Sequence, residues 1–335
     1  MKNLVYTCMF GKESYLELVK LLATSIHLFS HPNIDIDFLI ITENKFIDDI
    51  KSIFEDLNLN VNFMIMNLDN LNYALSSRFL IYNYEKINDY NKIVYVDIDI
   101  LITNNLSILF NLVLENKIYV LREGILSDPF YGKEYFDFTK VDPKTPAFSS
   151  GIILFNNCNE VKNLFNEINI FVEDNIKNNG THSCAYDQAI LNYFAITKNI
   201  YDNKLLNYYA VNNPASFNTY VINHFPGGVG SFERKYDLMK HFILQCYDNY
   251  NYNQFNYKKY NWMHDRKKTN GTLEFLPNGV LMTTWGEGSY TILPNNRIRA
   301  NWCGDDHLLT FDNSLSTFLS VRRFDYNLSS GNNAY

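Results

Sequence analysis

Short apolar segments alternate with amphipathic segments through about the first 245 residues of this chain. Residues 2–8, 34–42, 61–66 and 91–99 have the length and composition of strands, and the last of these is apolar enough for a buried one. The segments 13–29, 45–57 and 72–84 have hydrophobic residues at helical spacing, as do 164–176, 184–196 and 236–247. Strands that alternate with helices predict an α/β fold, in which helices cover both faces of a mostly parallel sheet.

The pattern changes near residue 271, where short strands are divided by turn residues. Pro277-Asn278-Gly279 and Pro294-Asn295-Asn296 are strong turn signals. This pattern predicts a small antiparallel β-module of four to six strands. Between the two patterns, a polar and aromatic stretch shows no clear period. We therefore expect a domain at 1–247, a linker at 248–265 and the β-module at 266–335.

Composition excludes some partners. The 335 residues are 47% hydrophobic, enough for a large core, and carry a net charge of -7 without a long basic run. Nucleic acids need clustered Lys and Arg, so we expect no nucleic-acid partner. No apolar run approaches the ~18–20 residues that cross a bilayer, and the start lacks the long apolar stretch of a signal peptide. These features predict a soluble, cytoplasmic protein with no membrane span.

The motif that carries chemistry is Asp97-Ile98-Asp99, at the end of the expected strand 91–99. Ligands of parallel sheets bind at the carboxyl ends of the strands. Two carboxylates one residue apart can hold a hard cation, which would bridge the oxygens of a diphosphate and neutralise the charge of a departing group. A second D-x-D, Asp35 and Asp37, enters a strand instead of leaving one, and we give it little weight.

These residues resemble a known family. The segment NKIVYVDIDILITNNLSILF resembles the signature of glycosyltransferase family 8 and its glycogenin-like relatives, which have the GT-A fold. Further segments resemble family motifs in the same order: LSSRFLIYNY (75–84), FSSGIILFNN (148–157), YDQAILN (186–192) and NHFPGG (223–228). The resemblance covers about residues 1–245. It implies a metal-dependent enzyme that transfers a sugar from a UDP-sugar donor to a hydroxyl of a glycan or glycoprotein acceptor, with retention of configuration.

The resemblance also implies roles for individual residues. Asp97, Asp99 and His224 would hold a divalent cation, and an imidazole beside two carboxylates favours Mn²⁺ over Mg²⁺. Asp187 and Gln188 would lie beside the anomeric carbon as the catalytic pair. The expected nucleotide-sugar contacts come from several segments: Tyr6, Thr7, Tyr15, Arg78, Asp97, Ile98, Ser149, Ser150, Gly151, Gly227, Gly228 and Lys235.

Two positions depart from the family pattern. Gly230 occupies the place of a Lys that follows the H-x-x-G motif, and no Pro-Trp comes after it. Lys235 or Arg234, one turn further on, would supply the missing phosphate contact. Ser149 replaces the usual Asn of the sugar-contact segment. Both changes leave the identity of the donor sugar open.

Other possibilities remain at this point. The added β-module resembles that of glycosyltransferases from large DNA viruses, which would place the protein in a host cytoplasm, and a homodimer is expected by analogy. A sugar-1-phosphate nucleotidyltransferase would need a Gly-rich basic loop after the first strand, which TCMFGKESY is not. A sugar-binding or scaffold protein on a degenerate transferase fold is the other alternative. In the β-module, Trp285, Tyr290, Trp302 and His307 would either stack on an acceptor sugar or form a small core.

Overall fold

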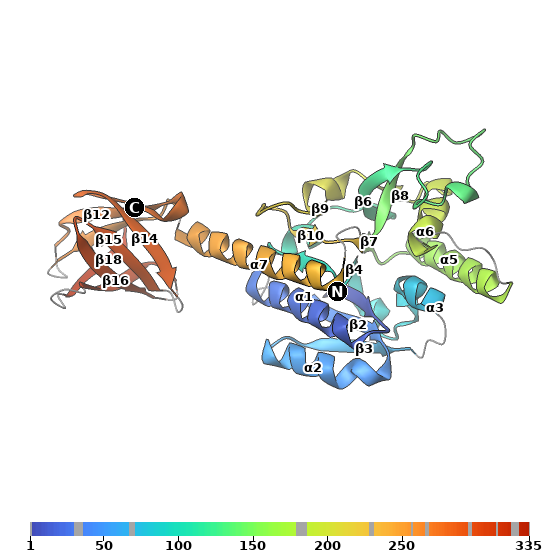
Figure 1. The fold of residues 1–335 in the computed structure, drawn as a ribbon, viewed down its shortest axis with the longest axis horizontal. Helices are drawn as coiled ribbons and strands as arrows, with labels where there is room; N and C mark the ends of the chain where they lie inside the picture. Colours follow the sequence, from blue (N-terminus) through green and yellow to red (C-terminus); the bar gives the residue numbers. More distant parts are fainter. Residues whose placement is uncertain are drawn as a thin grey trace. The chain divides into compact units, whose positions relative to one another are not determined.

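The computed structural model describes residues 2–29, 36–66, 71–178, 186–227, 231–255, 257–264, 268–293, 297–312, 314–322 and 328–334. The chain divides into two compact units, Met1–Ile243 and Leu244–Tyr335 (Figure 1). Each unit has its own hydrophobic core. Within the described residues, no helix is long and apolar enough to cross a membrane.

The first unit is built on a seven-stranded sheet with the order β3-β2-β1-β4-β7-β6-β8. The strands are β1 (Lys2–Met9), β2 (Ile36–Thr42), β3 (Val61–Ile65), β4 (Tyr90–Val96), β6 (Ile118–Ile125), β7 (Pro146–Asn156) and β8 (Tyr201–Asp202). The first four strands pair in parallel and β8 is parallel to β6, whereas β7 is antiparallel to both neighbours. The mostly parallel α/β sheet expected from the sequence is confirmed. Because β1 lies between β2 and β4, the strand order reverses there, which opens a crevice at the carboxyl ends.

Successive residues of the strands face opposite sides of the sheet. Val5, Ile40 and Val94 pack in a cluster with α1 (Leu16–Phe29) and α2 (Ile47–Asp56). Tyr6, Leu39 and Tyr95 pack in a second cluster. That cluster includes residues from the 3₁₀ helix η3 (Ser77–Asn83), α5 (Asn159–Lys177) and α6 (Tyr186–Thr197). The expected helix 72–84 is α-helical only over α3 (Leu71–Ser76) and continues as η3, which contacts both α3 and α5. The remaining short helices are α4 (Ser107–Phe110) and 3₁₀ turns at Glu13–Tyr15, Asn44–Phe46, Ile87–Asp89, Lys133–Tyr135 and Leu205–Tyr208.

A smaller sheet completes this unit and positions the candidate site. It contains β5 (Ile100–Ile102), β10 (Ile222–His224) and β9 (Ala210–Asn212), in the order β5-β10-β9. β10 is antiparallel to β5, so His224 lies opposite Ile100. This pairing brings His224 next to Asp99, the residue that precedes β5.

The segment expected to be a linker is structured. The last helix, predicted at 236–247, is α7 and runs from Phe232 to Phe255, and Lys259–Met263 forms strand β11. Residues 248–265 therefore include the end of a helix and a barrel strand, in contrast to the expected linker. The reason lies in their aromatic residues, because Phe255, Tyr260 and Trp262 are buried in the core of the second unit.

The second unit is a closed barrel of eight strands, more than the four to six expected. They are β11, β12 (Gly271–Leu276), β13 (Val280–Thr283), β14 (Gly286–Leu293), β15 (Arg297–Trp302), β16 (Asp305–Phe311), β17 (Thr317–Arg322) and β18 (Leu328–Asn333). Every strand is antiparallel to its neighbours, and β18 pairs with β11 to close the barrel (Figure 1, orange and red). The turn predicted at Pro277–Gly279 separates β12 from β13. The turn predicted at 294–296 lies outside the described residues.

Candidate active site

A cavity of about 490 Å³ lies at the carboxyl ends of the central strands of the first unit. Its wall includes Gly11 after β1, Glu43 after β2 and Asp97 after β4. This is the edge of the sheet that the strand pattern predicted for a ligand. The lining residues are Cys8, Phe10, Gly11, Tyr15, Leu18, Glu43, Ala74, Leu75, Arg78, Tyr95, Asp97, Ile98, Asp99 and Lys235.

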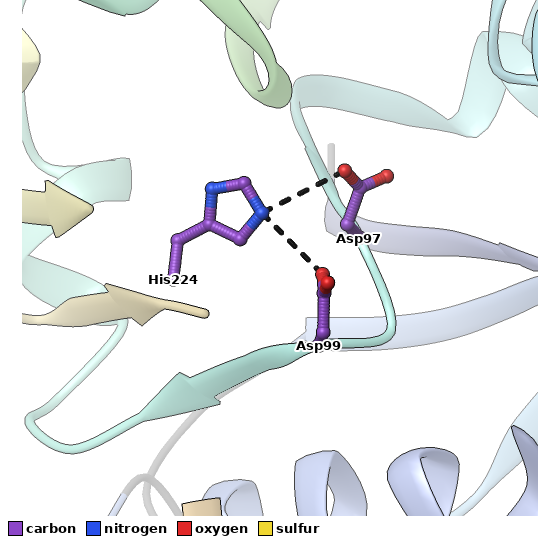
Figure 2. A group of neighbouring side chains, drawn as sticks. All are labelled: Asp97, Asp99 and His224. Atoms are coloured by element: carbon purple, nitrogen blue, oxygen red, sulfur yellow. Dashed lines mark ion pairs between the residues drawn. The ribbon is translucent and has the colours of Figure 1, made fainter. Parts of the chain in front are cut away.

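Asp97, Asp99 and His224 meet beside this cavity (Figure 2). The Nε2 atom of His224 lies 3.3 Å from Oδ1 of Asp99 and 3.8 Å from Oδ2 of Asp97. One ligand atom from each of the three residues lies within 4.8 Å of the others. Two carboxylates and one imidazole thus converge on a common point, in the part of the chain that the structure describes.

The backbone and Asn212 hold this group in place. The Asp97 N–H donates to the carbonyl of Gly151 over 2.9 Å, and the Phe225 N–H donates to the carbonyl of Asp99 over 2.9 Å. Nδ1 of His224 lies 2.8 Å from Oδ1 of Asn212, and since that oxygen only accepts, Nδ1 is the donor. This fixes the ring so that Nε2 faces the two carboxylates, as in many metal-bound histidines.

The glycine at 151 lets His224 and Asp97 lie close to the backbone of β7. A Cβ at Gly151 would lie 2.4 Å from Cε1 of His224 and 2.8 Å from Oδ2 of Asp97. The three side chains therefore fit a divalent cation in the nature of their donor atoms and in the spacing of those atoms.

Neighbouring basic and acidic side chains shift the pKa values within this group. Burial raises the pKa of Asp99, but the hydrogen bond and charge of His224, together with Lys235, more than offset it and lower that pKa to about 2. Burial would lower the pKa of His224, yet its hydrogen bond to Asp99 and the two carboxylate charges raise it. His224 and Lys235 thus favour the charged form of Asp99, whereas at Asp97 burial outweighs the neighbouring basic groups and raises the pKa.

Arg78 links the predicted metal ligands to the predicted catalytic residues. Its guanidinium lies 3.2 Å from Oδ1 of Asp97 and 3.2 Å from Oδ2 of Asp187. It also donates to the carbonyl of Ser150 over 2.8 Å and lies 4.6 Å from the ring centre of Tyr95. Burial alone would lower the pKa of Arg78, but the charges of Asp187 and Asp97 raise it, so the side chain stays charged. The Tyr95 hydroxyl donates to Asp97 as well.

Lys235 reaches the site from α7. Its ammonium forms an ion pair with Oδ2 of Asp99, and the side chain lines the cavity. The sequence departure at position 230 left this role open between Lys235 and Arg234. Arg234 is exposed, whereas the ammonium of Lys235 contacts the carboxylate of Asp99. The structure therefore favours Lys235 for this role.

Asp187 and Gln188 lie at the start of α6, against the 149–151 segment of β7. The Ser150 hydroxyl donates to Asp187 over 2.8 Å, and the Ser150 N–H donates to Oε1 of Gln188 over 3.2 Å. The Gly151 N–H donates to the Ser149 hydroxyl oxygen over 3.2 Å. The fold therefore brings these five predicted residues together, with Arg78 between them and the acidic group.

The other predicted donor contacts are distributed unevenly. Tyr15 and Ile98 line the cavity. Tyr6 is fully buried, and its hydroxyl donates over 2.8 Å to the carbonyl of Arg78, so it supports that residue from the core. Thr7 is also buried and, like Tyr6, is not part of the cavity wall among the described residues. Gly227 is exposed, and Gly228 lies outside the described residues.

Several residues of the cavity wall were not predicted. They are Cys8, Phe10, Gly11, Leu18, Glu43, Ala74, Leu75 and Tyr95. Glu43 accepts a hydrogen bond of 2.9 Å from the Gly11 N–H and so joins the ends of β1 and β2. Gly11 and Glu43 could have been predicted from their positions in the sequence, because residues that directly follow two adjacent parallel strands lie at the same edge of the sheet.

Comparisons with known structures agree with this arrangement. The galactosyltransferase LgtC, crystallised with donor and acceptor sugar analogues, is similar with a TM-score of 0.50 and 15% identity, over 72% of this chain and 95% of that chain. The bifunctional glycosyltransferase WbbM in its apo form is similar with a TM-score of 0.51 and 17% identity, over 72% of this chain and 49% of that chain. At these identities the likeness establishes the fold, a glycosyltransferase domain of the GT-A type.

The family is established from the sequence. The model of glycosyl transferase family 8 matches residues 8–213, more than half of the 335-residue chain. The chain therefore belongs to glycosyltransferase family 8 and is a glycosyltransferase, with Asp97, Asp99 and His224 as its candidate metal site. A search of curated proteins gave no significant match. None of the matches supports the viral origin expected from the added β-module.

Proposed function

We propose that this glycosyltransferase uses a UDP-sugar donor and a divalent cation, Mn²⁺ before Mg²⁺, and transfers the sugar to a hydroxyl of a glycan or glycoprotein. The observation that carries the proposal is the convergence of Asp97, Asp99 and His224 beside a cavity of about 490 Å³. A volume of this size falls within the usual range for sites that hold small molecules and cofactors. The similar structure of LgtC was determined with donor and acceptor sugar analogues, which fits the same substrate class.

In this proposal, Asp97, Asp99 and His224 hold the cation, which supplies positive charge to the diphosphate when bound. Lys235 contributes a second positive charge from α7 to the phosphates, because its ammonium already lies at Asp99. Tyr15, which also lines the cavity, contacts the nucleoside. Arg78 orients Asp97 and Asp187 at once, so that the donor sugar and the diphosphate are aligned by a single buried guanidinium.

Asp187 and Gln188 position the sugar in the same proposal. Asp187 accepts hydrogen bonds from sugar hydroxyls, and Gln188 lies on the face of the anomeric carbon, where its amide already bridges Ser150 and Phe130. Retention of configuration is part of the proposal and rests on the family resemblance. Analysis of the anomeric configuration of the first product by NMR tests it, and an inverted product contradicts retention while leaving the donor assignment intact.

The deciding experiment is release of UDP from a panel of UDP-sugars, with Mn²⁺, with Mg²⁺ and with a chelator. We expect release from one donor sugar in the presence of Mn²⁺, lost with the chelator and lost in Asp99→Ala. Truncation of this carboxylate removes one of three ligand groups, and we expect a decrease of at least about 10²-fold. Asp37→Ala is the matched control, because Asp37 belongs to the other D-x-D and pairs with Lys2 at the opposite end of β2.

A wild-type protein that neither releases nor binds UDP in the presence of Mn²⁺ contradicts the proposal. The degenerate, sugar-binding alternative would then be favoured. Formation of a nucleotide-sugar from a sugar-1-phosphate and a nucleoside triphosphate would instead identify a nucleotidyltransferase.

Lys235 carries a separate prediction. If its ammonium contacts the donor phosphates, Lys235→Ala is expected to raise the KM for the UDP-sugar by about tenfold, the effect of a charge-assisted contact of 1.5–3 kcal/mol discounted for partial exposure. Lys235→Arg keeps the charge and is expected to retain most of the affinity. Arg234→Ala, an exposed neighbour on the same helix, serves as the control. An unchanged KM in Lys235→Ala, with Asp99→Ala inactive, would show that Lys235 only neutralises Asp99.

A further inference from the structure

A second cavity lies within the barrel unit and is separate from the site described above. Its volume is about 250 Å³, far above the roughly 10–15 Å³ that one water molecule needs by this measure, so it is much larger than a packing defect. The chain has three tryptophans, and all of them, Trp262, Trp285 and Trp302, line this cavity. They come from the end of β11, the turn between β13 and β14, and the end of β15, which meet at one end of the barrel.

Two of the tryptophans are buried and pack against each other at the base of the cavity. Trp262 and Trp302 are 1% and 6% exposed, and their rings are perpendicular with centres 5.2 Å apart. His307 stacks on Trp302 with ring centres 4.0 Å apart and an angle of 7°. Burial lowers the pKa of His307 to about 4, so this ring is neutral at pH 7 and acts as one more aromatic surface.

Trp285 differs from the other two because it is 40% exposed. It packs over Gly271, where an added Cβ would lie 2.6 Å from the indole. The backbone N–H of Trp285 donates to the hydroxyl oxygen of Thr283 over 3.0 Å, which fixes the backbone of the turn. An indole that is held in place and still open to solvent is suited to stack on a ligand and is not needed for the core.

Polar groups lie on the same cavity wall. Arg322 forms an ion pair of 3.2 Å with Asp305, and both side chains are part of the wall. The indole N–H of Trp262 is buried without a hydrogen-bond partner among the described residues. The wall thus combines a flat apolar surface with a charged donor and a charged acceptor, the two kinds of contact that a sugar ring requires.

We propose that this end of the barrel binds one sugar residue of a glycan. The apolar C–H face of the pyranose lies on the indole of Trp285, and its hydroxyls donate to Asp305 and accept from Arg322. The site lies entirely within Leu244–Tyr335, so binding does not depend on the transferase site. Only the identification of that glycan as the acceptor, or as a part of it, rests on the function proposed above.

Other ligands fit the wall less well. A quaternary ammonium group, which aromatic cages also bind, has no hydroxyl groups and would offer no hydrogen bond to the Asp305–Arg322 pair. A nucleic acid would place phosphates near Asp305 on a chain with a net charge of -7. A neutral ring with both an apolar face and hydroxyl groups satisfies the aromatic and the charged residues together.

The experiment uses the intrinsic fluorescence of the full chain, because every tryptophan reports on this cavity. The protein is titrated with methyl glycosides of common hexoses and pentoses and with short oligosaccharides, with excitation selective for tryptophan. We expect a saturable change in emission with at least one saccharide. Trp285→Ala is expected to weaken that binding by about tenfold, while Trp262 and Trp302 still report it.

Three controls make the result specific. Met282→Ala removes a side chain of similar exposure (39%) from the same hairpin, outside the cavity wall, and is expected to bind like wild type. Asp305→Asn tests the polar contact without loss of an aromatic ring, in case Trp285→Ala does not fold. Asp99→Ala is expected to lose UDP release and to keep saccharide binding, which separates the two sites.

Two outcomes would contradict a sugar site in the barrel. No saturable change with any saccharide contradicts it, and so does unchanged affinity in both Trp285→Ala and Asp305→Asn. Saturation by choline in place of a glycoside would identify an ammonium site instead. Saccharide binding by a wild-type protein that releases no UDP from any donor would contradict the proposed transferase function and still support this sugar site.

Discussion

Gly151→Ala is expected to lower Mn²⁺-dependent UDP release by roughly 10²-fold, the effect of displacing a catalytic group by about 1 Å. The added methyl group would lie 2.4 Å from His224 and 2.8 Å from Asp97, distances at which atoms must move. Neither side chain can yield easily, because His224 is held by Asn212 and Asp97 by Arg78. The displacement therefore falls on the candidate cation site itself.

The measurement is UDP release as a function of Mn²⁺ concentration in wild type and variant. We expect the concentration of Mn²⁺ needed for half-maximal release to rise in Gly151→Ala, together with a lower maximum. Gly227→Ala is the matched control, because Gly227 is an exposed glycine at which a Cβ would meet no atom within 4 Å among the residues that the structure describes. Wild-type dependence on Mn²⁺ in Gly151→Ala would show that the cation binds elsewhere.

The part of the site that follows a single strand was predictable from local pattern. An apolar segment that ends in Asp97 and Asp99 places both carboxylates at the carboxyl end of its strand, which is where ligands of parallel sheets bind. His224 could not be placed in this way. It reaches Asp99 only because β10 pairs with β5, a contact between distant parts of the chain, and the resemblance to the family was the only signal for it.

The second role of Arg78 and the closure of the barrel also depend on distant contacts. The sequence predicted Arg78 as a donor contact, but its pairing with both Asp97 and Asp187 requires η3, β4 and α6 to meet. The stretch expected to be a linker has no helical or alternating period, yet β11 completes the barrel by pairing with β18. A barrel closes only when its first and last strands pair, and these two strands lie too far apart in the sequence for a local pattern to predict their contact.

Arg78→Ala is expected to produce the largest loss of stability, about 3–5 kcal/mol in the free energy of unfolding of the first unit. Arg78 is 8% exposed and is the cation shared by the carboxylates of Asp97 and Asp187. Its removal leaves two largely buried negative charges without that partner, and it also removes the donor to the Ser150 carbonyl. The cost of the uncompensated charges exceeds that of an ordinary hydrogen bond.

Denaturant unfolding with two probes measures this effect on each unit. Circular dichroism in the presence of a chelator follows the helices of the first unit, and tryptophan emission follows only the barrel, which contains all three tryptophans. For Arg78→Ala we expect the transition followed by circular dichroism to move to a lower denaturant concentration. The transition followed by tryptophan emission is expected to stay at the wild-type concentration. Arg122→Ala, an exposed arginine on β6, is expected to change neither.

A double variant separates charge compensation from simple packing. If the loss in Arg78→Ala arises from unpaired carboxylates, adding Asp187→Asn removes one of those charges and recovers part of the stability, so the double variant loses less than the sum of the single changes. Additive losses would mean that Arg78 stabilises the unit through its contacts with Asp97, Tyr95 and Ser150 and not through Asp187. In that case Arg78 would align the 149–151 segment without coupling the acidic group to Asp187.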